Sequence, residues 1–284
     1  MTKIAFITTV FPSISQYMGG FFSSLMNQTY NDFDIVIVND GLEDVGLSIP
    51  NALKQRVMIL EPGTSPVKNR EILLNHTKKQ GYDIAIWGDA DDLFYPNRVE
   101  ASVNGLKGND IYVNELQTFG STKEIDFVGT RLKNKTRIEH GYILDKNLFG
   151  MTNTAMRLKL IEDDFVFADV VAADWYLFSR LLSNGARAIY SNETKSHYRQ
   201  HCENLVGSGR ICDSKLEYVL NVRDLHFSAM AEISSLYKEI YEENLILLNA
   251  VKNRELTCDN NQVPSNMANP LWWELPELVA RKQL

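Results

Sequence analysis

The sequence is poor in cysteine and has no long apolar run. Its three cysteines, Cys202, Cys212 and Cys258, lack C-x-x-C spacing, which argues against a disulfide framework and a zinc ribbon. The opening apolar run Ile4–Ile7 is too short for a signal peptide, and no run approaches the roughly 20 residues that a membrane-spanning helix needs. We therefore expect a cytoplasmic protein that does not span a membrane, either free or peripheral on the membrane's inner face.

The sequence also lacks an excess of positive charge. Its formal net charge is −7 at pH 7, whereas nucleic-acid-binding proteins usually present a basic face that neutralises phosphates. A nucleic-acid partner is therefore not expected, and a small anionic ligand would need a local group of cationic side chains or a metal ion. The chain of 284 residues has 44% hydrophobic and 23% charged residues, which is typical of a globular protein with a sizeable core.

Strands and helices alternate along the first part of the chain. Runs rich in apolar and β-branched residues predict strands at Ile4–Thr9, Phe33–Val38, Arg56–Leu60 and Ile84–Trp87. Helices are predicted between them at Met18–Met26 and Val67–Gln80, the second after the N-cap Ser65 and Pro66. This alternation predicts an α/β fold with a doubly wound, mostly parallel sheet flanked by helices.

The pattern weakens after Pro96, where another helix is expected to start. The polar stretch Gly120–Gly150 is interpreted either as a solvated loop or as a mobile acceptor or phosphate loop. Further elements are expected as a half-exposed strand over Asp110–Thr118, a helix over Ala172–Leu182, a strand over Ala186–Tyr190 and a strand or strand exit at Ser196–His201.

The last part of the chain has helical spacing. Ser214 to Glu217 fits a capping box, and residues 211–284 are expected to form a C-terminal helical extension and tail. Its apolar residues Leu216, Val219, Met230 and Leu236 are expected to pack on the catalytic domain or on a second copy, as a homodimer. The tail with Trp272 and Trp273 either packs back on the domain or forms a sticky surface patch.

Three aspartates, Asp89, Asp91 and Asp92, follow the strand predicted at Ile84–Trp87. Carboxylates packed so closely repel one another and usually need a cation, and a hard ion such as Mg²⁺ or Mn²⁺ accepts carboxylate oxygens while leaving positions for substrate phosphates. The alternative is a solvated acidic turn that caps the next helix.

Asp40 and Arg70 are candidate ligand-binding residues because of their place in the predicted sheet. Asp40, in the turn Asn-Asp-Gly, could be only a turn former, and Arg70, on an early helical turn, only a surface charge. However, parallel α/β sheets place their ligand sites at the carboxyl ends of the strands. The first, second and fourth predicted strands can all deliver such side chains to that edge.

Four ordered blocks of the sequence resemble family 2 glycosyltransferases of the GT-A fold. The resemblance covers roughly Lys3 to Gly207. The blocks are NQTYNDFDIVIVNDG ending at Gly41, the segment from Asn69-Arg70 through Gly81-Tyr82-Asp83-Ile84 to Asp89-Ala90-Asp91-Asp92 and Pro96-Asn97, Asp174-Trp175, and Tyr198-Arg199-Gln200-His201 with Asn204 and Gly207.

The resemblance implies roles for single residues. Asp91 would hold the metal, with His201 as a candidate second ligand; the alternative for His201 is a polar residue at a strand exit. Asp174 falls at the position of the catalytic base of inverting members, although a carboxylate there is also favoured by the helix dipole. The nucleotide-sugar-binding residues that the resemblance implies are Thr8, Thr9, Asp40, Arg70, Asp89 and Ala90.

The resemblance therefore implies an inverting transferase that needs Mn²⁺ or Mg²⁺ and moves a sugar from a nucleoside diphosphate, most plausibly UDP, to a hydroxyl of a saccharide or lipid-linked acceptor. Residues 1–210 would be the GT-A catalytic domain, with 1–118 binding the nucleotide sugar and 119–210 the acceptor. The chain lacks a Q-x-x-R-W element, so a single addition is expected. Departures from the family pattern are Asn39, Ala173 and Cys202.

Two other functions remain open from the sequence. A sugar-nucleotide nucleotidyltransferase would also combine such a sheet with acidic ligands, but it usually has a basic, glycine-rich loop after the first strand. Here Val10–Gly20 has only two glycines and no lysine or arginine to bind a triphosphate. The other alternative is a non-catalytic nucleotide-binding scaffold on the same fold.

Overall fold

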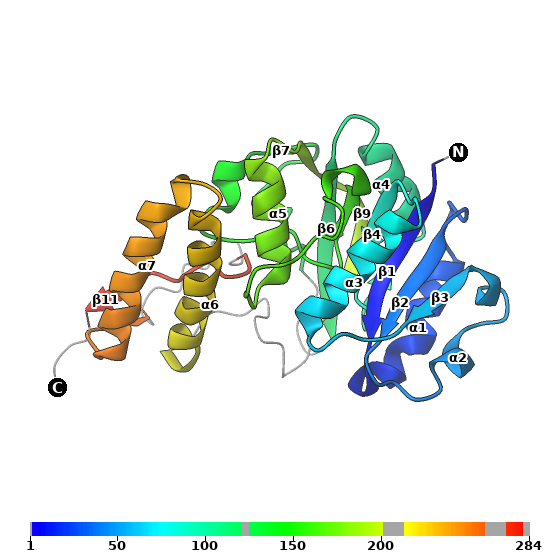
Figure 1. The fold of residues 1–284 in the computed structure, drawn as a ribbon, viewed down its shortest axis with the longest axis horizontal. Helices are drawn as coiled ribbons and strands as arrows, with labels where there is room; N and C mark the ends of the chain where they lie inside the picture. Colours follow the sequence, from blue (N-terminus) through cyan, green and yellow to red (C-terminus); the bar gives the residue numbers. More distant parts are fainter. Residues whose placement is uncertain (1, 121–124, 201–212, 259–270, 281–284) are drawn as a thin grey trace.

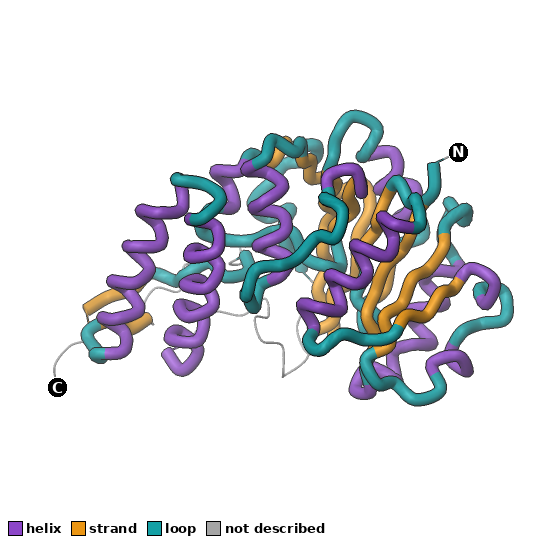
Figure 2. The backbone as a smooth tube through the Cα atoms, viewed as in Figure 1, coloured by secondary structure: helices purple, strands orange, loops and turns teal. Residues whose placement is uncertain are grey.

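The computed structural model describes residues 2–120, 125–200, 213–258 and 271–280. A large sheet with helices on both faces fills one side of the molecule, and two long helices lie on the other side (Figures 1 and 2). Along the sheet the strand order is β3-β2-β1-β4-β8-β6-β9-β5, with β7 paired to β9. The strands are β1 Ile4–Val10, β2 Asp34–Asn39, β3 Val57–Leu60, β4 Ile84–Trp87, β5 Leu93–Phe94, β6 Ile111–Gly120, β7 Arg137–Ile138, β8 Thr154–Arg157 and β9 Ala188–Gln200.

The strands β1 to β4 are parallel neighbours, as the sequence predicts. They are apolar on both faces because helices cover both. Along β1, Ala5 and Ile7 belong to one core cluster and Ile4 and Phe6 to the other, the alternation expected of a strand. The helices on the first face are α3 (Pro66–Lys79) and α5 (Ala173–Ser183), and those on the second are α1 (Met18–Met26) and α4 (Arg98–Gly105).

The predicted exposure of the strand at 110–118 is wrong. In β6 every residue from Ile111 to Leu116 is buried, because β8 and β9 flank it and helices cover it. The charged residue of this run, Glu115, is fully buried and accepts hydrogen bonds from the Tyr190 hydroxyl at 2.6 Å and from the amides of Leu116, Val128 and Gly129. A buried carboxylate is tolerated where its oxygens are satisfied in this way.

The interpretation of Gly120–Gly150 as a solvated loop holds for only part of the described stretch, because Lys133, Lys135 and Arg137 are exposed while other residues are buried. The amides of Val128 and Gly129 are bonded to Glu115, so the backbone is tied to the sheet. Its apolar side chains fill the core under α5; those fully buried are Phe127, Val128, Ile143, Leu148 and Phe149.

Short or interrupted strands of the sheet are not predicted from the sequence. β5, β7 and β8 have only two, two and four residues, and they form through pairing with distant strands. The strands predicted at Ala186–Tyr190 and Ser196–His201 are one strand, β9, whose register shifts opposite Asn114 and Glu115. This irregularity interrupts the alternation from which a single strand would be predicted.

The C-terminal helices α6 (Asp213–Ala231) and α7 (Leu236–Lys252) pack against α5 as an antiparallel pair (Figure 1). The predicted apolar stripe is buried at Leu216, Val219 and Met230, mostly as expected. Leu236 is an exception, because it starts α7 and is 58% exposed. No helix in the described ranges is both long and apolar enough to cross a membrane.

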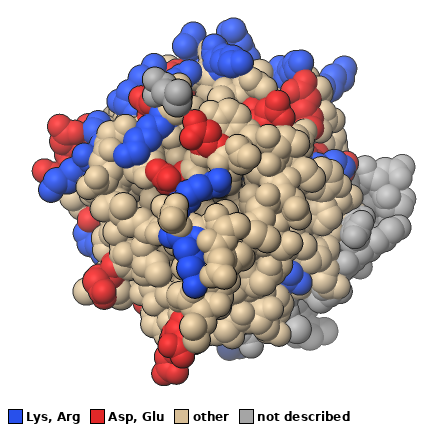
Figure 3. All heavy atoms as spheres, turned by 90° about the vertical axis from the view of Figure 1, so that its right-hand side faces the viewer, with Lys and Arg blue, Asp and Glu red and all other residues tan. Residues whose placement is uncertain are grey.

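The segment with Trp272 and Trp273 packs back on the domain. The two indoles are 7% and 8% exposed, and the segment continues into β11 (Leu278–Ala280), which pairs with β10 (Leu256–Cys258). On the molecular face beside β3, acidic and basic side chains are interspersed among uncharged ones (Figure 3).

A buried histidine joins α6 to α5 and supplies a pH test. The ring of His226 stacks on Trp175 at 3.7 Å, and burial lowers the pKa of His226 well below 6.5, with Arg223 and His140 acting in the same direction. Only the unfolded chain then takes up this proton, so stability present above pH 6.5 is lost as the pH falls. In His226→Phe, urea unfolding should lose less stability between pH 7 and 5 than in the wild type.

The expected difference approaches about 1.4 kcal/mol per pH unit at the acidic end. Comparing the two proteins cancels other groups, including carboxylates with raised pKa that act oppositely. Parallel stability curves for the variant and the wild type would show that His226 is protonated in the fold.

Candidate active site

A cavity of about 630 Å³ opens at the carboxyl ends of β1, β2 and β4. The structure brings most of the residues singled out in the sequence to its wall. These are Thr8, Thr9, Asp40, Arg70, Asp89, Ala90, Asp91 and Asp174. His201, the candidate second metal ligand, lies outside the described residues.

The β2 end of the cavity is held by an asparagine. Asp40 follows β2, and its backbone amide donates to Val10 O at 2.7 Å, which joins the ends of β1 and β2. The buried Asn69 of α3 donates its side-chain amide to Asp40 Oδ2 at 2.9 Å and accepts from the Gly63 amide at 2.7 Å. Asn69 therefore orients Asp40. The sequence resemblance includes the Asn69-Arg70 segment but implies no role for Asn69.

The β4 end turns sharply at Gly88. A Cβ atom there would lie 2.3 Å from the Phe6 ring and 2.6 Å from Phe94, so the close packing of the two rings requires glycine. The next turn is closed by the Asp92 amide, which donates to Asp89 O at 3.1 Å. The turn carries Asp89 and Asp91 into the cavity, while Asp92 points into the protein and is 1% exposed.

Burial and repulsion between carboxylates raise the pKa of two aspartates in this turn. Burial, then repulsion from Asp91 and Asp174, raises the pKa of Asp89 to about 7, although Arg70 opposes the shift. Burial, then repulsion from Asp91 and Asp89, raises the pKa of Asp92 well above its ordinary value. A ligand that brings positive charge here would be stabilised, because it relieves this repulsion.

Arg199 connects β9 with the acidic turn. Its amide donates to Asp92 Oδ1 at 2.7 Å and its Nε to Asp91 O at 2.8 Å. The guanidinium lies between the rings of Tyr17 and Phe119, at 4.1 and 4.3 Å from their centroids. The motif Tyr-Arg-Gln-His marks this segment in the sequence, but only the fold shows that the arginine hydrogen-bonds the acidic turn.

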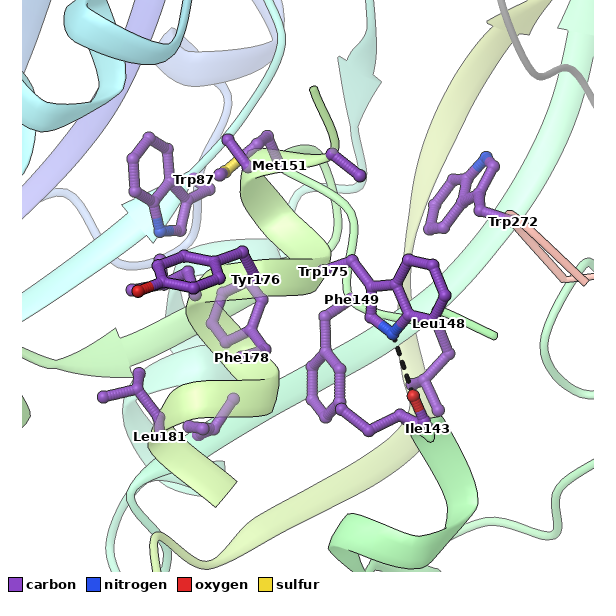
Figure 4. Close-up of a cluster of buried hydrophobic side chains, with 14 of the residues drawn as sticks. Trp87, Ile143, Leu148, Phe149, Met151, Trp175, Tyr176, Phe178, Leu181 and Trp272 are labelled. Atoms are coloured by element: carbon purple, nitrogen blue, oxygen red, sulfur yellow. Dashed lines mark hydrogen bonds between the residues drawn. The ribbon is translucent and has the colours of Figure 1, made fainter. Parts of the chain in front are cut away.

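Asp174 lies in the first turn of α5. Its Oδ1 accepts from the Trp175 amide at 2.8 Å. Burial raises the pKa of Asp174, while Arg70 and hydrogen bonds from Trp175 and Asn147 oppose the rise. The helix itself is anchored because Trp175 Nε1 donates to Ile143 O at 2.8 Å (Figure 4). A carboxylate of raised pKa that faces a cavity is a candidate for proton transfer.

The cavity also has an aromatic side that the sequence analysis did not assign to the site. It contains Trp87 at the end of β4, Tyr198 of β9, and Trp272 and Trp273 from the C-terminal segment. Adjacent tryptophans in the tail are a signal of a buried or binding role, but their position beside the acidic turn depends on long-range packing.

A sequence profile described as "Glycosyl transferase family 2" matches residues 6–164. The chain belongs to this family. Two uncharacterized glycosyltransferases of Haemophilus influenzae are similar to it: one is 25% identical and covers 88% of this chain and 85% of its own length, and the other is 24% identical, with 77% and 84% covered.

Solved structures share the fold of this glycosyltransferase. S. aureus TarS residues 1–349, crystallised in complex with UDP-GlcNAc, superposes with a TM-score of 0.60 at 14% identity, covering 88% of this chain and 72% of that one. The complex of the same TarS fragment with UDP gives a TM-score of 0.59. The expected GT-A fold and glycosyltransferase activity are thus confirmed at the level of the family.

The acidic turn also bears on the expected divalent ion. Asp89 and Asp91 present hard oxygen donors to the cavity, and their mutual repulsion would be relieved by a cation. Across the described ranges no three acidic, histidine or cysteine side chains are grouped as a complete metal site. The residues present therefore fit a Mg²⁺ or Mn²⁺ site that is completed by substrate phosphates and water, as is usual for Mg²⁺.

Proposed function

We propose that this enzyme transfers a sugar from a UDP-sugar to an acceptor hydroxyl, with inversion, in single additions. The observation that carries the proposal is the meeting of the donor-binding candidates, the acidic turn and Asp174 in one cavity. The TarS fragment whose fold it shares was crystallised with UDP-GlcNAc and with UDP, which supports uracil as the nucleobase.

Each side of the cavity is assigned one part of the donor. Thr8, Thr9 and the oriented Asp40 would contact the uracil base, Asp89 and Ala90 the ribose, and Arg70 would lie beside the diphosphate. Asp91, with Asp89 beside it, would hold the divalent ion, which when bound neutralises the diphosphate leaving group. An arginine near the phosphates adds positive charge on the same side.

Asp174 is proposed as the general base. Its carboxylate would accept the proton of the acceptor hydroxyl as that oxygen forms a bond to the anomeric carbon. The bond from that carbon to the diphosphate oxygen breaks at the same time, and UDP leaves with the electron pair. Because attack and departure occur on opposite faces, the configuration inverts. Burial raises the pKa of Asp174, which makes its carboxylate a better proton acceptor than an ordinary aspartate.

A panel of nucleotide sugars tests the proposal. The purified protein, with Mn²⁺, is incubated with UDP-GlcNAc, UDP-glucose, UDP-galactose and GDP-mannose, with and without methyl glycosides as acceptors. We expect release of UDP from at least one UDP-sugar and none of GDP. Release of GDP alone would refute the assignment of a UDP-sugar donor. If the protein binds UDP but releases no nucleoside diphosphate from any donor, a non-catalytic scaffold would be favoured.

A further inference from the structure

Trp272 and Trp273 reach the cavity from far along the chain. They lie beyond residues 6–164, which the family profile matches, and their segment runs back along α7 and α6 toward α5 (Figure 1). Both indoles line the cavity together with Met151 and Tyr198. Figure 4 shows Trp272 extending from the C-terminal segment toward the side chains around α5.

The turn that presents the indoles is held by several polar contacts. The Leu271 amide donates to Glu274 Oε2 at 2.9 Å, and the Glu274 amide donates to Leu271 O at 3.2 Å. The Arg131 guanidinium pairs with the same carboxylate through two contacts, from Nη1 to Oε1 at 2.9 Å and from Nη2 to Oε2 at 2.8 Å. Such bidentate pairs fix geometry as well as charge.

Trp273 has a strained backbone. Its φ is +65°, a conformation that costs a residue with a side chain on the order of 1 kcal/mol or more and persists only where the surroundings impose it. Arg223 of α6 is one source of this constraint, because its Nη1 donates to Trp273 O at 2.7 Å. Strain maintained in this way is concentrated at functional sites.

Arg223 of α6, which contacts the tryptophan turn, is a buried charged residue. It is 6% exposed, and its described hydrogen-bond acceptors are the carbonyls of Asp145 and Trp273 and the side-chain oxygen of Asn244. Its guanidinium also lies 4.9 Å from the centroid of the Phe227 ring. Burying a guanidinium whose described hydrogen bonds go to uncharged acceptors is costly. These hydrogen bonds join α6, α7, the loop before β8 and the tryptophan turn, and so fix the position of that turn.

The tryptophan side of the cavity adjoins the proposed base. The Asn147 amide donates to Trp272 O at 2.8 Å, and the Asn147 side chain hydrogen-bonds Asp174. A Cβ on Gly150 would lie 2.5 Å from the Trp272 ring, so Trp272 fits closely on the loop before β8. The donor candidates Thr8 and Asp40, by contrast, come from β1 and β2.

We propose that Trp272 and Trp273 form an aromatic wall of the acceptor subsite that selects a saccharide, and that Arg223 is a positioning residue for this wall. The acceptor hydroxyl must lie within reach of Asp174, so the surface next to that carboxylate contacts the acceptor. The C–H faces of a pyranose are apolar and pack on aromatic rings, which serve as rigid walls in binding pockets. The inference rests on the proposed transferase function.

The test separates effects on acceptor binding from effects on donor binding and hydrolysis. Trp272→Ala, Trp273→Ala and the matched phenylalanine variants are compared with the wild type in three measurements: UDP affinity by calorimetry, UDP-sugar hydrolysis without acceptor, and KM for methyl glycosides. We expect the alanine variants to raise the acceptor KM at least tenfold and to keep the other two values within threefold. Phenylalanine should restore KM to within threefold of wild type.

Arg223→Lys tests the positioning role, because lysine keeps the charge but lacks the planar fork. It should raise the acceptor KM in the same direction, with little change in kcat or UDP affinity. Val279→Ala, on the same segment but outside the cavity, is the matched control and should change nothing. If the alanine variants fail to fold, Glu274→Gln, which loosens the turn and keeps both indoles, must raise the acceptor KM.

The remaining outcomes are distinguishable. The proposed aromatic wall would be refuted by folded alanine variants whose acceptor KM is unchanged. It would also be refuted if their UDP affinity fell by the same factor as the acceptor KM rose. An unchanged KM in Glu274→Gln, or a wild type that hydrolyses UDP-sugar but accepts no saccharide, would refute it as well. A wild type that turns over no nucleotide sugar at all would instead refute the proposed function.

Discussion

Asp174→Asn is expected to lower the turnover of sugar transfer by about 10²- to 10⁴-fold, the usual contribution of a positioned acid–base group. The amide is nearly isosteric and can still accept the hydrogen bond that the Trp175 amide donates to Asp174 Oδ1, so the fold should persist. It cannot take the proton of the acceptor hydroxyl. UDP affinity, measured by calorimetry, should stay within about threefold, because an interaction made in the transition state is lost and not one made in donor binding.

The pH profile gives a second reading of the same residue. A general base works when deprotonated, so wild-type kcat should fall as the pH drops through the raised pKa of Asp174, whereas the residual activity of Asp174→Asn should lack this limb. If Asp174→Asn keeps transfer within about threefold of wild type, worth only ~0.65 kcal/mol, the residue is a helix-end carboxylate and another base must act.

Removal of divalent ions is expected to weaken UDP binding by at least about tenfold, because two phosphate charges would otherwise lie beside the aspartates of the acidic turn. Asp91→Asn should cause a similar loss with Mn²⁺ present, and EDTA should then have little further effect. Calorimetry with UDP, using protein loaded with Mn²⁺ and protein treated with EDTA, measures both effects.

Asp163→Asn is the control for this comparison, since Asp163 is 91% exposed and paired with Lys78 outside the cavity. It should bind UDP as the wild type does and remain sensitive to EDTA. Equal affinity of the metal-loaded and the EDTA-treated wild type for both UDP and GDP would refute the metal site. Asp91 would then be an acidic turn residue only.

The part of the site at the ends of β1, β2 and β4 could be predicted because its information is local. The strand ending at Trp87, the turn at Asp40 and the N-cap Ser65, which accepts from the Lys68 amide at 3.2 Å, each appear within a few residues of sequence. The parallel order of the strands then brings their ends to one edge. Asp40, Arg70 and Asp91 do line one cavity.

The rest of the sheet depends on contacts between distant segments. Glu115 is a charged residue in a half-polar pattern until the amides of Val128 and Gly129 and the Tyr190 hydroxyl surround it. Likewise the strand β5 exists only because it pairs with β9, about a hundred residues later. Alternation of residue types cannot report a partner that lies so far along the chain.

By itself, the sequence determined the alternation of strands and helices up to the end of β4, the edge at which the acidic residues gather, and the family to which the chain belongs. Only the tertiary structure decided that Asp89 has a pKa near 7, since that value depends on burial and on Asp174 and Arg70. It alone placed Trp272 and Trp273 beside Asp174. Electrostatic fields and packing act through space, so they become visible when residues far apart in the chain lie a few ångströms from one another.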